Sequence, residues 1–344
     1  MGGAGAAEEW WLPGSTEVAP GVHRIPLPLP NDALKAVNVY ALIGEGGVDL
    51  VDSGWALANA QELLADALEG LDCSLRDVRR FLVTHVHRDH YTQAIVLRRE
   101  FGTRVSLGID EQASLAEFRH PDRVPMHAQF DRLLSSGADE LVAQLTSQFG
   151  HSGGVSAPFY EEPDDWLEPD TEVSAGGRSL EVVATPGHTR GHVVFYESEE
   201  HLLFAGDHVL PTITPSIGFE PVVSPSPLAD FLRSLAVVRS RPDALLLPAH
   251  GPVAPSAHHR VDELVAHHGR RLDETEDAVA HGSDTALAVA GRLRWTRRER
   301  RLTELDPFNQ MLAVLETAAH LDLLVAQGRI TTTTVDGVDV HGIA

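Results

Sequence analysis

Four potential metal ligands fall within six positions of the chain, in the segment Thr84-His85-Val86-His87-Arg88-Asp89-His90. Side chains two positions apart in an extended segment point to the same side, so His85 and His87 can bind one ion. Asp89 and His90 follow where the chain is expected to turn into a helix, and they can reach a second ion nearby. Imidazole and carboxylate ligands suit divalent cations, above all zinc, although iron and manganese also fit such sites.

Three further motifs with potential ligands occur downstream, each where a strand is expected to end. In Thr185-Pro-Gly-His188 the proline and glycine bend the chain sharply and expose the histidine. Asp207 follows Ala-Gly, and its carboxylate can bridge two cations and neutralise the charge between them. His250 lies in Pro-Ala-His-Gly. Together the four motifs predict a two-metal centre built from seven side chains: His85, His87, Asp89, His90, His188, Asp207 and His250.

Three other residues near these motifs have less certain roles. We expect His192, which opens the strand after the His188 turn, to lie behind the ligands rather than among them. His208 can face the substrate as a proton donor or pack against the sheet. Tyr91 can stabilise a developing oxyanion, although a buried aromatic side chain at a helix start is more common.

The motifs lie within an alternation of strands and helices, which predicts an α/β fold. Strands are expected at Ala36–Ile43, Val48–Val51, Arg80–Val83, Ser179–Ala184, His192–Tyr196, Leu202–Phe204 and Ala244–Leu247. Helices are expected at Leu57–Glu69, Thr92–Phe101 and Leu228–Val238. In this arrangement the ends of separate strands carry all the ligands.

Residues 109–165 interrupt the alternation with a mostly helical pattern that ends in Gly150-His-Ser-Gly-Gly154. We interpret this segment as an insertion beside the active site that can act as a lid, or else as a surface helical pair without a role in binding.

The chain beyond residue 255 is expected to form a separate C-terminal module. Helices are expected at His258–Val279, Ala286–Arg292 and Pro307–Gln327, before a short strand or wing at Ile330–Thr334. Pro252 and Pro255 predict a junction that divides residues 15–255 from residues 256–344.

The composition bounds the possible partners of the chain. Its 27 basic and 50 acidic residues give a net charge of −23, which disfavours a nucleic-acid substrate because such binding depends on Lys and Arg. Met1–Pro13 has no basic or apolar character of a signal peptide, and no apolar run is long enough to span a membrane. We therefore expect a cytoplasmic protein without a membrane partner; no sequence feature fixes its oligomeric state.

The order of these motifs resembles that of the metallo-β-lactamase superfamily, over roughly residues 20–255. The shared patterns are His-x-His-x-Asp-His, Gly-His-Thr-x-Gly-His, Gly-Asp and Pro-x-His-Gly, together with the acidic turn Leu50-Val-Asp52-Ser-Gly54. The stretch from Glu316 to Arg329 is similar to the lactamase-beta-like-2 and glyoxalase II-type group.

The resemblance implies an αββα sandwich with a helical insertion and a small, winged-helix-like C-terminal module. It also implies that His85, His87 and His188 form one metal site, and that Asp207 bridges this site to the second. The second site would consist of Asp89, His90 and His250, and Asp52 would support the ligands from behind. One departure is Tyr91-Thr92-Gln93, where the family often has glycine; the helix can then start further from the metals, or Thr92 can cap it.

A pair of metals about 3.5–4 Å apart can hold a hydroxide at neutral pH and polarise a carbonyl or phosphoryl oxygen. We expect Asp89 to orient that hydroxide and accept its proton. Asp207 argues against antibiotic hydrolysis, because β-lactamases of this fold lack the bridging aspartate. Flavin-diiron proteins have a glutamate at the position of His87, so this residue argues against that class of protein. The nucleases of this superfamily have a long insertion between the bridging aspartate and the last histidine. Only 43 positions separate Asp207 from His250, which are too few for that insertion.

The favoured substrate is a small-molecule ester, most of all a thioester of the acyl-CoA, acyl-carrier or acyl-glutathione type. Alternatives are RNA phosphodiester cleavage, a lactone substrate, and a non-catalytic protein that keeps its metals for structure. The RNA alternative rests on six arginines between Arg292 and Arg301, with Trp295 among them as a possible base-stacking platform. This run can equally be a solvated helix face that pairs with the acidic body.

Overall fold

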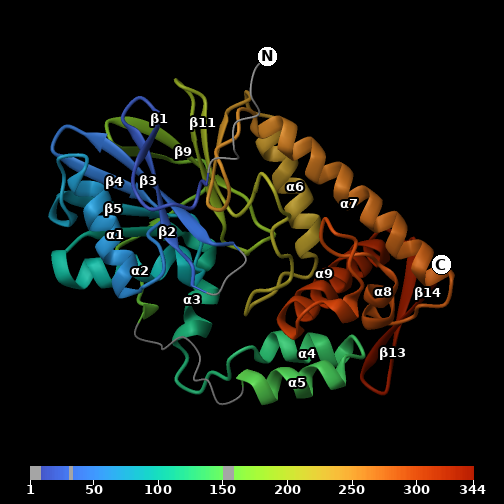
Figure 1. The fold of residues 1–344 in the computed structure, drawn as a ribbon. Coiled ribbons are helices and arrows are strands. Elements are labelled where there is room, and N and C mark those ends of the chain that lie inside the picture. The colour runs from blue at the N-terminus through green and yellow to red at the C-terminus, as the bar shows by residue number, and fades with distance from the viewer. Residues whose placement is uncertain (1–8, 31–33, 150–158) are drawn as a thin grey trace.

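The computed structural model describes residues 9–30, 34–149 and 159–344. Two β-sheets face each other, and helices cover their outer faces (Figure 1). The helices α1 and α2 lie on one side, and α6 and α7 lie on the other (Figure 1). This is the αββα arrangement that the family resemblance implies.

The first sheet has seven strands in sequence order. Its first four strands pair antiparallel and the remainder pair parallel. The strands are β1 (Thr16–Ala19), β2 (Val22–Pro28), β3 (Ala36–Gly44), β4 (Gly47–Val51), β5 (Val78–Val83), β6 (Arg104–Gly108) and β7 (Asp165–Leu167).

The second sheet has five strands in the order β12-β11-β10-β9-β8. Only β11 and β12 pair parallel. The strands are β8 (Glu172–Ala175), β9 (Arg178–Ala184), β10 (Val193–Glu197), β11 (Leu202–Gly206) and β12 (Leu245–Pro248).

Three apolar clusters hold these layers together. The cluster between the sheets joins residues such as Leu42 and Leu82 of the first sheet to Phe195 and Phe204 of the second. A second cluster packs the outer face of the first sheet against α1 (Ala58–Glu69), α2 (Arg88–Phe101) and α3 (Gln112–Arg119). The two sheets are therefore fixed to each other independently of the helices.

The third cluster lies on the outer face of the second sheet and contains residues of the six remaining α-helices. These are α4 (His127–Ser135), α5 (Asp139–Phe149), α6 (Pro227–Arg239), α7 (Ala257–Ala280), α8 (Ala286–Arg292) and α9 (Pro307–Ala326). The last helix is followed by the hairpin of β13 (Ile330–Val335) and β14 (Val338–Ile343).

The helical insertion is anchored on the C-terminal helices. Both α4 and α5 pack against α9, below it in Figure 1. Arg132 of α4 forms ion pairs with Asp322 of α9 and Asp339 of β14. Residues on both sides of position 255 pack in one apolar core. A boundary between two separate units at this position therefore stays a prediction. The glycine-rich end of the insertion, residues 150–154, lies outside the described residues.

The structure confirms the strands and helices expected from the sequence, with small shifts at their ends. One larger difference concerns α2, which begins at Arg88 rather than Thr92. Thr92 is therefore not a cap: its hydroxyl lies within the helix, donates to the Arg88 carbonyl and accepts from the Ala56 amide. No helix among the described residues is long and apolar enough to cross a membrane.

Candidate metal centre

The seven predicted ligands meet where strands of both sheets end. His85 follows β5 and His188 lies in the turn after β9. Asp207 comes directly after β11, and His250 is the second residue after β12. Parallel pairing puts the ends of β11 and β12 at the same edge. The ligands therefore converge because the strands end together, although they are up to 165 positions apart along the chain.

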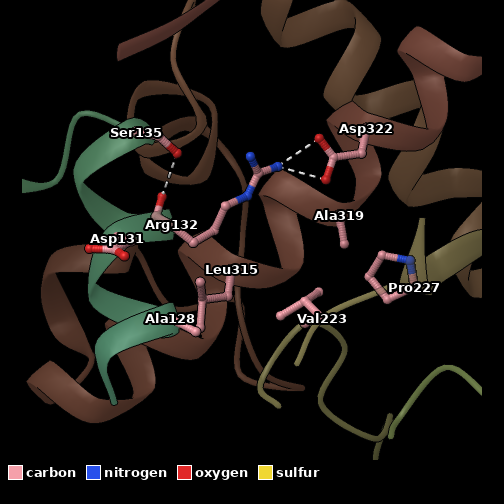
Figure 2. A pocket seen from close by; sticks show the side chains of 10 residues that line it. Ala128, Asp131, Arg132, Ser135, Val223, Pro227, Leu315, Ala319 and Asp322 are labelled. Carbon is pink, nitrogen blue, oxygen red and sulfur yellow. Dashed lines mark hydrogen bonds and ion pairs between the residues drawn. The ribbon is translucent and has the colours of Figure 1, made fainter. Parts of the chain in front are cut away.

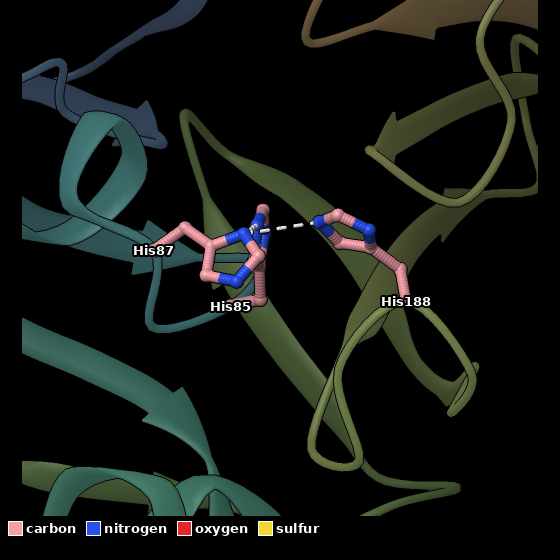
Figure 3. A group of neighbouring side chains, drawn as sticks. All are labelled: His85, His87 and His188. Atoms are coloured by element: carbon pink, nitrogen blue, oxygen red, sulfur yellow. Dashed lines mark hydrogen bonds between the residues drawn. The ribbon is translucent and has the colours of Figure 1, made fainter. Parts of the chain in front are cut away.

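Three histidines form the first group, and their rings converge from the β5 loop and the β9 turn (Figure 3). His87 Nδ1 lies 3.0 Å from His85 Nε2 and 3.1 Å from His188 Nε2. Three imidazole nitrogens this close match the edges of a tetrahedron around a cation with Zn–N bonds of about 2.0–2.1 Å. This group can hold one metal ion.

Asp89, His90 and His250 form the second group. The Asp89 carboxylate oxygen Oδ2 lies 3.6 Å from His90 Nε2 and 3.5 Å from His250 Nε2. These separations are also those of ligands around one cation rather than of direct hydrogen bonds.

Asp207 lies between the two groups and turns one oxygen to each. Its Oδ2 is 3.4 Å from His188 Nε2 of the first group. Its Oδ1 is 3.3 Å from His250 Nε2 and 3.7 Å from His90 Nε2 of the second group. A carboxylate in this position can bridge two cations.

Backbone carbonyls and a carboxylate fix the orientation of the ligand rings. His188 Nδ1 donates to the Ser216 carbonyl at 2.9 Å, and His250 Nδ1 donates to the Ala36 carbonyl at 2.8 Å. His90 Nδ1 donates to Asp52 Oδ2 at 2.9 Å. Because each Nδ1 carries the proton, each Nε2 presents a lone pair to the centre, as metal-binding histidines do.

Asp52 supports both ligand groups from behind. It directly follows β4, and its backbone has a φ of 59°, which non-glycine residues rarely adopt. Its Oδ1 accepts from the Thr84 amide at 2.8 Å and from the Thr84 hydroxyl at 3.0 Å. Thr84 Oγ1 in turn lies 3.1 Å from His85 Nδ1. Asp52 thus supports His90 directly and His85 through Thr84.

Burial and the neighbouring carboxylates set the charge of the centre. Burial lowers the pKa of His90, but Asp52 and then Asp89 and Asp207 outweigh it and raise this pKa to about 10. Burial and neighbouring histidines hold the pKa of His87 at about 3. Without a cation the carboxylates thus favour a proton on His90, while His87 is neutral, and a metal ion that binds here displaces the His90 proton.

Several buried polar atoms of the centre have no hydrogen-bond partner among the described residues: His90 Nε2, His250 Nε2 and Asp207 Oδ1. A buried polar atom without a partner costs about 1–3 kcal/mol, and three of them pointing into one space need a common ligand. Once His90 has lost the proton on Nε2, each of the three atoms offers a lone pair, and a cation can satisfy all of them. The donor set therefore fits divalent metal ions.

His192 lies behind Asp207 in the structure. Its Nε2 accepts from the Asp207 amide at 3.1 Å, and its Nδ1 lies 2.8 Å from the Thr185 hydroxyl. Both of its ring nitrogens are therefore engaged, and it fixes the backbone of the bridging residue while its ring packs 5.0 Å from that of His85.

The two residues proposed to contact substrate are both in the core. His208 is fully buried against Phe231, with 5.1 Å between the ring centroids, and burial lowers its pKa to about 3. This placement favours packing over proton donation. The Tyr91 hydroxyl donates to the Glu161 carbonyl at 2.5 Å, so it is not available as an oxyanion donor in this conformation.

The structure adds a residue that sequence patterns did not single out. Glu111, at the start of the insertion, is fully buried, and its Oε1 accepts from the Val86 amide and the Thr189 hydroxyl. These partners belong to the His85 loop and the His188 turn, which Glu111 therefore ties together. Nothing in the local sequence signals this role, because the carboxylate acts only through distant loops.

The proposed base-stacking role of Trp295 is wrong. Its side chain is buried, its Nε1 donates to the Ala290 carbonyl, and the Arg271 guanidinium lies 4.4 Å from its ring centroid. The segment is also not a helix face but a tight turn in which Trp295 pairs with Arg300. The six arginines are exposed, without an aromatic side chain between them to stack on bases.

Comparisons with known proteins agree with this geometry. The family model for the metallo-beta-lactamase superfamily matches residues 33–250. A beta-lactamase-like protein 2 homolog of Caenorhabditis elegans is 33% identical over 37% of this chain, a match that spans only 41% of that relative. An atrochrysone carboxyl ACP thioesterase of Aspergillus novofumigatus is 25% identical over 84% of this chain and 72% of its own length.

A solved structure extends the likeness to nearly the whole chain. A metallo-beta-lactamase family protein from Thermus thermophilus superposes with a TM-score of 0.77 at 28% identity, over 95% of this chain and 100% of that protein. The family match covers more than half of the chain and includes all seven ligand positions. The chain is therefore a metal-dependent hydrolase that belongs to the metallo-β-lactamase superfamily.

Proposed function

We propose that this protein is a two-metal thioesterase. The observation that carries the two-metal proposal is Asp207, whose two oxygens face different ligand groups. His85, His87 and His188 would hold one cation, and Asp89, His90 and His250 the other, with Asp207 bridging. Zinc suits these nitrogen and oxygen ligands, and iron or manganese would also fit.

Two divalent cations at this position would polarise the substrate carbonyl and lower the pKa of a water molecule. The chain's own contribution to the reaction is then Asp89. Its side chain is 16% exposed, more than the 10% of Asp207 and the 2% of His250, so it is the carboxylate that entering water meets first. Asp89 would orient the attacking water and accept its proton.

Charge and similarity support a carbonyl substrate over RNA. A chain of net charge −23 repels a polyphosphate backbone, and the burial of Trp295 removes the aromatic platform on which the RNA alternative depended. The relative that matches 84% of the chain is named as a thioesterase. We therefore favour an acyl thioester, with RNA and lactones as the alternatives to be tested.

A substrate panel tests this proposal on the metal-loaded protein. It should contain acyl-CoA, acyl-glutathione, a lactone and short single-stranded RNA, and metal content should be measured in the same samples. We expect two metal equivalents, thioester turnover, and loss of turnover when a chelator removes the metals. RNA cleavage that disappears when Arg297 and Arg298 are replaced, without thioester turnover, would contradict the proposal. Two bound metals with no turnover on any substrate would instead support the non-catalytic alternative.

A further inference from the structure

A pocket of about 370 Å³ lies where the insertion meets the C-terminal helices (Figure 2). Ligand pockets commonly measure about 300–1,000 Å³. One wall is α4 and the facing wall is α9, and the chain between β11 and α6 closes the pocket. The pocket is thus built by three segments that are distant in sequence.

Small side chains keep the two helices from filling this space. Ala128 of α4 and Ala319 of α9 both line the pocket, and Ala319 lies between the larger Leu315 and Asp322. On α9 the lining positions Leu315, Ala319 and Asp322 recur at intervals of four and three, so they share one face. The opening therefore exists because alanine occupies the positions at which longer side chains would meet.

The pocket is apolar at its base and carries no unpaired cation among the residues that line it. Leu315, Pro227 and Val223 contribute its apolar surface, and Val223 is 39% exposed at the edge. The one lining guanidinium, that of Arg132, bonds to both oxygens of Asp322 at 2.6 Å. Asp131 adds a further negative charge. Such a lining disfavours a phosphate group and suits an uncharged aliphatic chain.

One segment connects this pocket to the metal centre. Residues 207–226 have neither helix nor strand, which is unusual for twenty consecutive residues in a compact domain and typical of functional loops. The segment begins at Asp207, supports His188 through the Ser216 carbonyl, and reaches the pocket at Gly218. Gly218 is two residues from Ser216, so their Cα atoms are at most about 7.6 Å apart.

Arg132 also makes the α4 wall part of a fixed structure. Its ion pairs with Asp322 and Asp339 join α4 to α9 and to the β14 hairpin. Leu133, the next residue, is fully buried in the same apolar cluster as Leu315. The insertion therefore shapes a preformed pocket rather than one that forms only when a lid closes.

We propose that this pocket binds the aliphatic tail of an acyl thioester, and that the insertion thereby sets the preferred acyl-chain length. This inference rests on the proposed thioesterase function. The reacting carbonyl lies at the metal centre, the tail runs along residues 207–226 into the pocket, and the polar thiol part of the substrate stays outside it.

Chain-length profiles test the proposal. The substrates are acyl N-acetylcysteamine thioesters from acetyl to decanoyl, which are uncharged and differ only in the tail. For the wild-type protein we expect kcat/KM to rise about fourfold per added methylene, the equivalent of about 0.8 kcal/mol each, until the pocket is full. Ala128→Phe should flatten this rise, so that the ratio of kcat/KM for the decanoyl thioester to that for the acetyl thioester falls. Val265→Phe, at an exposed position of α7, is the control and should keep the wild-type profile.

Ala319→Phe fills the pocket from the opposite wall and should give the same result as Ala128→Phe. A wild-type profile without dependence on chain length, or a steep rise that persists in both variants, would overturn the proposal.

A binding measurement separates this inference from the proposed function. The probe is 1-decanol, which has no hydrolysable bond, and it should raise the Tm of the wild-type protein more than that of Ala128→Phe. Absence of turnover on every thioester together with this difference in Tm would contradict the proposed function alone. An equal effect of decanol on both proteins would contradict the acyl-tail pocket.

Discussion

Asp89 has two possible tasks at the residue scale, as a ligand of the second group and as the acceptor of a proton. The change Asp89→Asn separates them, because asparagine keeps an oxygen ligand but cannot accept the proton as a carboxylate does. We expect kcat to fall about 10²–10⁴-fold while both metals stay bound, as measured by steady-state kinetics and metal analysis of the same samples.

Asp110→Asn removes a negative charge from an exposed position near the same loops and serves as the control. It should keep wild-type turnover. A fully active Asp89→Asn protein would show that Asp89 is not the proton acceptor, and loss of metal would show that its main task is ligation.

The buried carboxyl group of Glu111 should make the folding stability of the protein depend on pH. Burial raises the pKa of this carboxyl from 4.5 to about 7, although the Thr189 hydroxyl and Val86 amide favour ionisation. The folded protein therefore holds this proton up to a higher pH than the unfolded chain does. Ionisation of Glu111 then costs about 3 kcal/mol of folding free energy, a cost that is absent below pH 4.5, grows as pH rises and is complete above pH 7.

The change Glu111→Gln removes this titration and keeps a hydrogen-bond acceptor. Denaturant unfolding of the metal-free proteins should show that the wild type loses more stability than Glu111→Gln between pH 5 and pH 7.5. Glu220, whose pKa burial raises to about 8, titrates in both proteins, and because Glu111 contributes to that rise, the difference between the curves reports Glu111 together with its effect on Glu220. Parallel stability curves would show that Glu111 is already ionised at pH 5.

At the scale of single elements, the ligand motifs were predictable because each follows a strand whose apolar pattern is clear. The groups that orient the ligands were not predictable from the sequence. His188 and His250 are oriented by the backbone carbonyls of Ser216 and Ala36, and every residue has such a carbonyl. The same holds for Glu111, which becomes a support only when two distant loops meet on it.

Several strands also escaped sequence analysis. β2 contains two prolines, and β7 and β8 have only three and four residues, so none shows a strong alternation. The early start of α2 was missed because the ligand motif hides it. The motif His85–His90 has the spacing of ligands at a strand end, yet His87 is the residue before the first helical turn and Asp89 lies within that turn.

The turn that carries His188 depends on a close approach of two backbones at Gly191. A Cβ atom there would lie 2.1 Å from the Glu111 amide nitrogen and 2.5 Å from the Asp110 carbonyl carbon, too close for either segment to tolerate. Gly191→Ala should therefore cost about 3 kcal/mol or more and displace the His188 turn from the insertion. We expect a lower Tm and weaker metal binding, measured by calorimetry and metal titration.

Gly269, in the exposed middle of α7, has no atom within 4 Å of the equivalent Cβ position and is the matched control. Gly269→Ala should stabilise the protein by about 1 kcal/mol, because alanine favours the helix. Equal stability of the two variants would show that the Gly191 contact is not tight in solution.

At the scale of the whole molecule, the metal centre sits between two sheets that are held together by a core of their own. The outer clusters then attach α1 and α2 to one sheet and α6 to α9 to the other. The ligands follow strand ends of both sheets, so a bound metal ion would link the first sheet to the second. The C-terminal helices and the insertion add the pocket and share the core of the second sheet.

The net charge of −23 belongs to the molecule as a whole and should govern how fast charged substrates arrive. Acyl-CoA carries phosphates, which this field repels, whereas an acyl N-acetylcysteamine thioester is neutral. Salt screens such repulsion, since the Debye length falls from about 30 Å at 0.01 M to about 8 Å at 0.15 M ionic strength. For the same acyl group, kcat/KM of the CoA thioester should therefore rise about tenfold over this range, while that of the neutral thioester stays constant. Stopped-flow or steady-state assays at constant pH measure both. A fall of kcat/KM with salt for the CoA thioester would mean that a local basic surface outweighs the overall charge at the entrance to the site. The first candidate for that surface is the set of exposed arginines from Arg292 to Arg301.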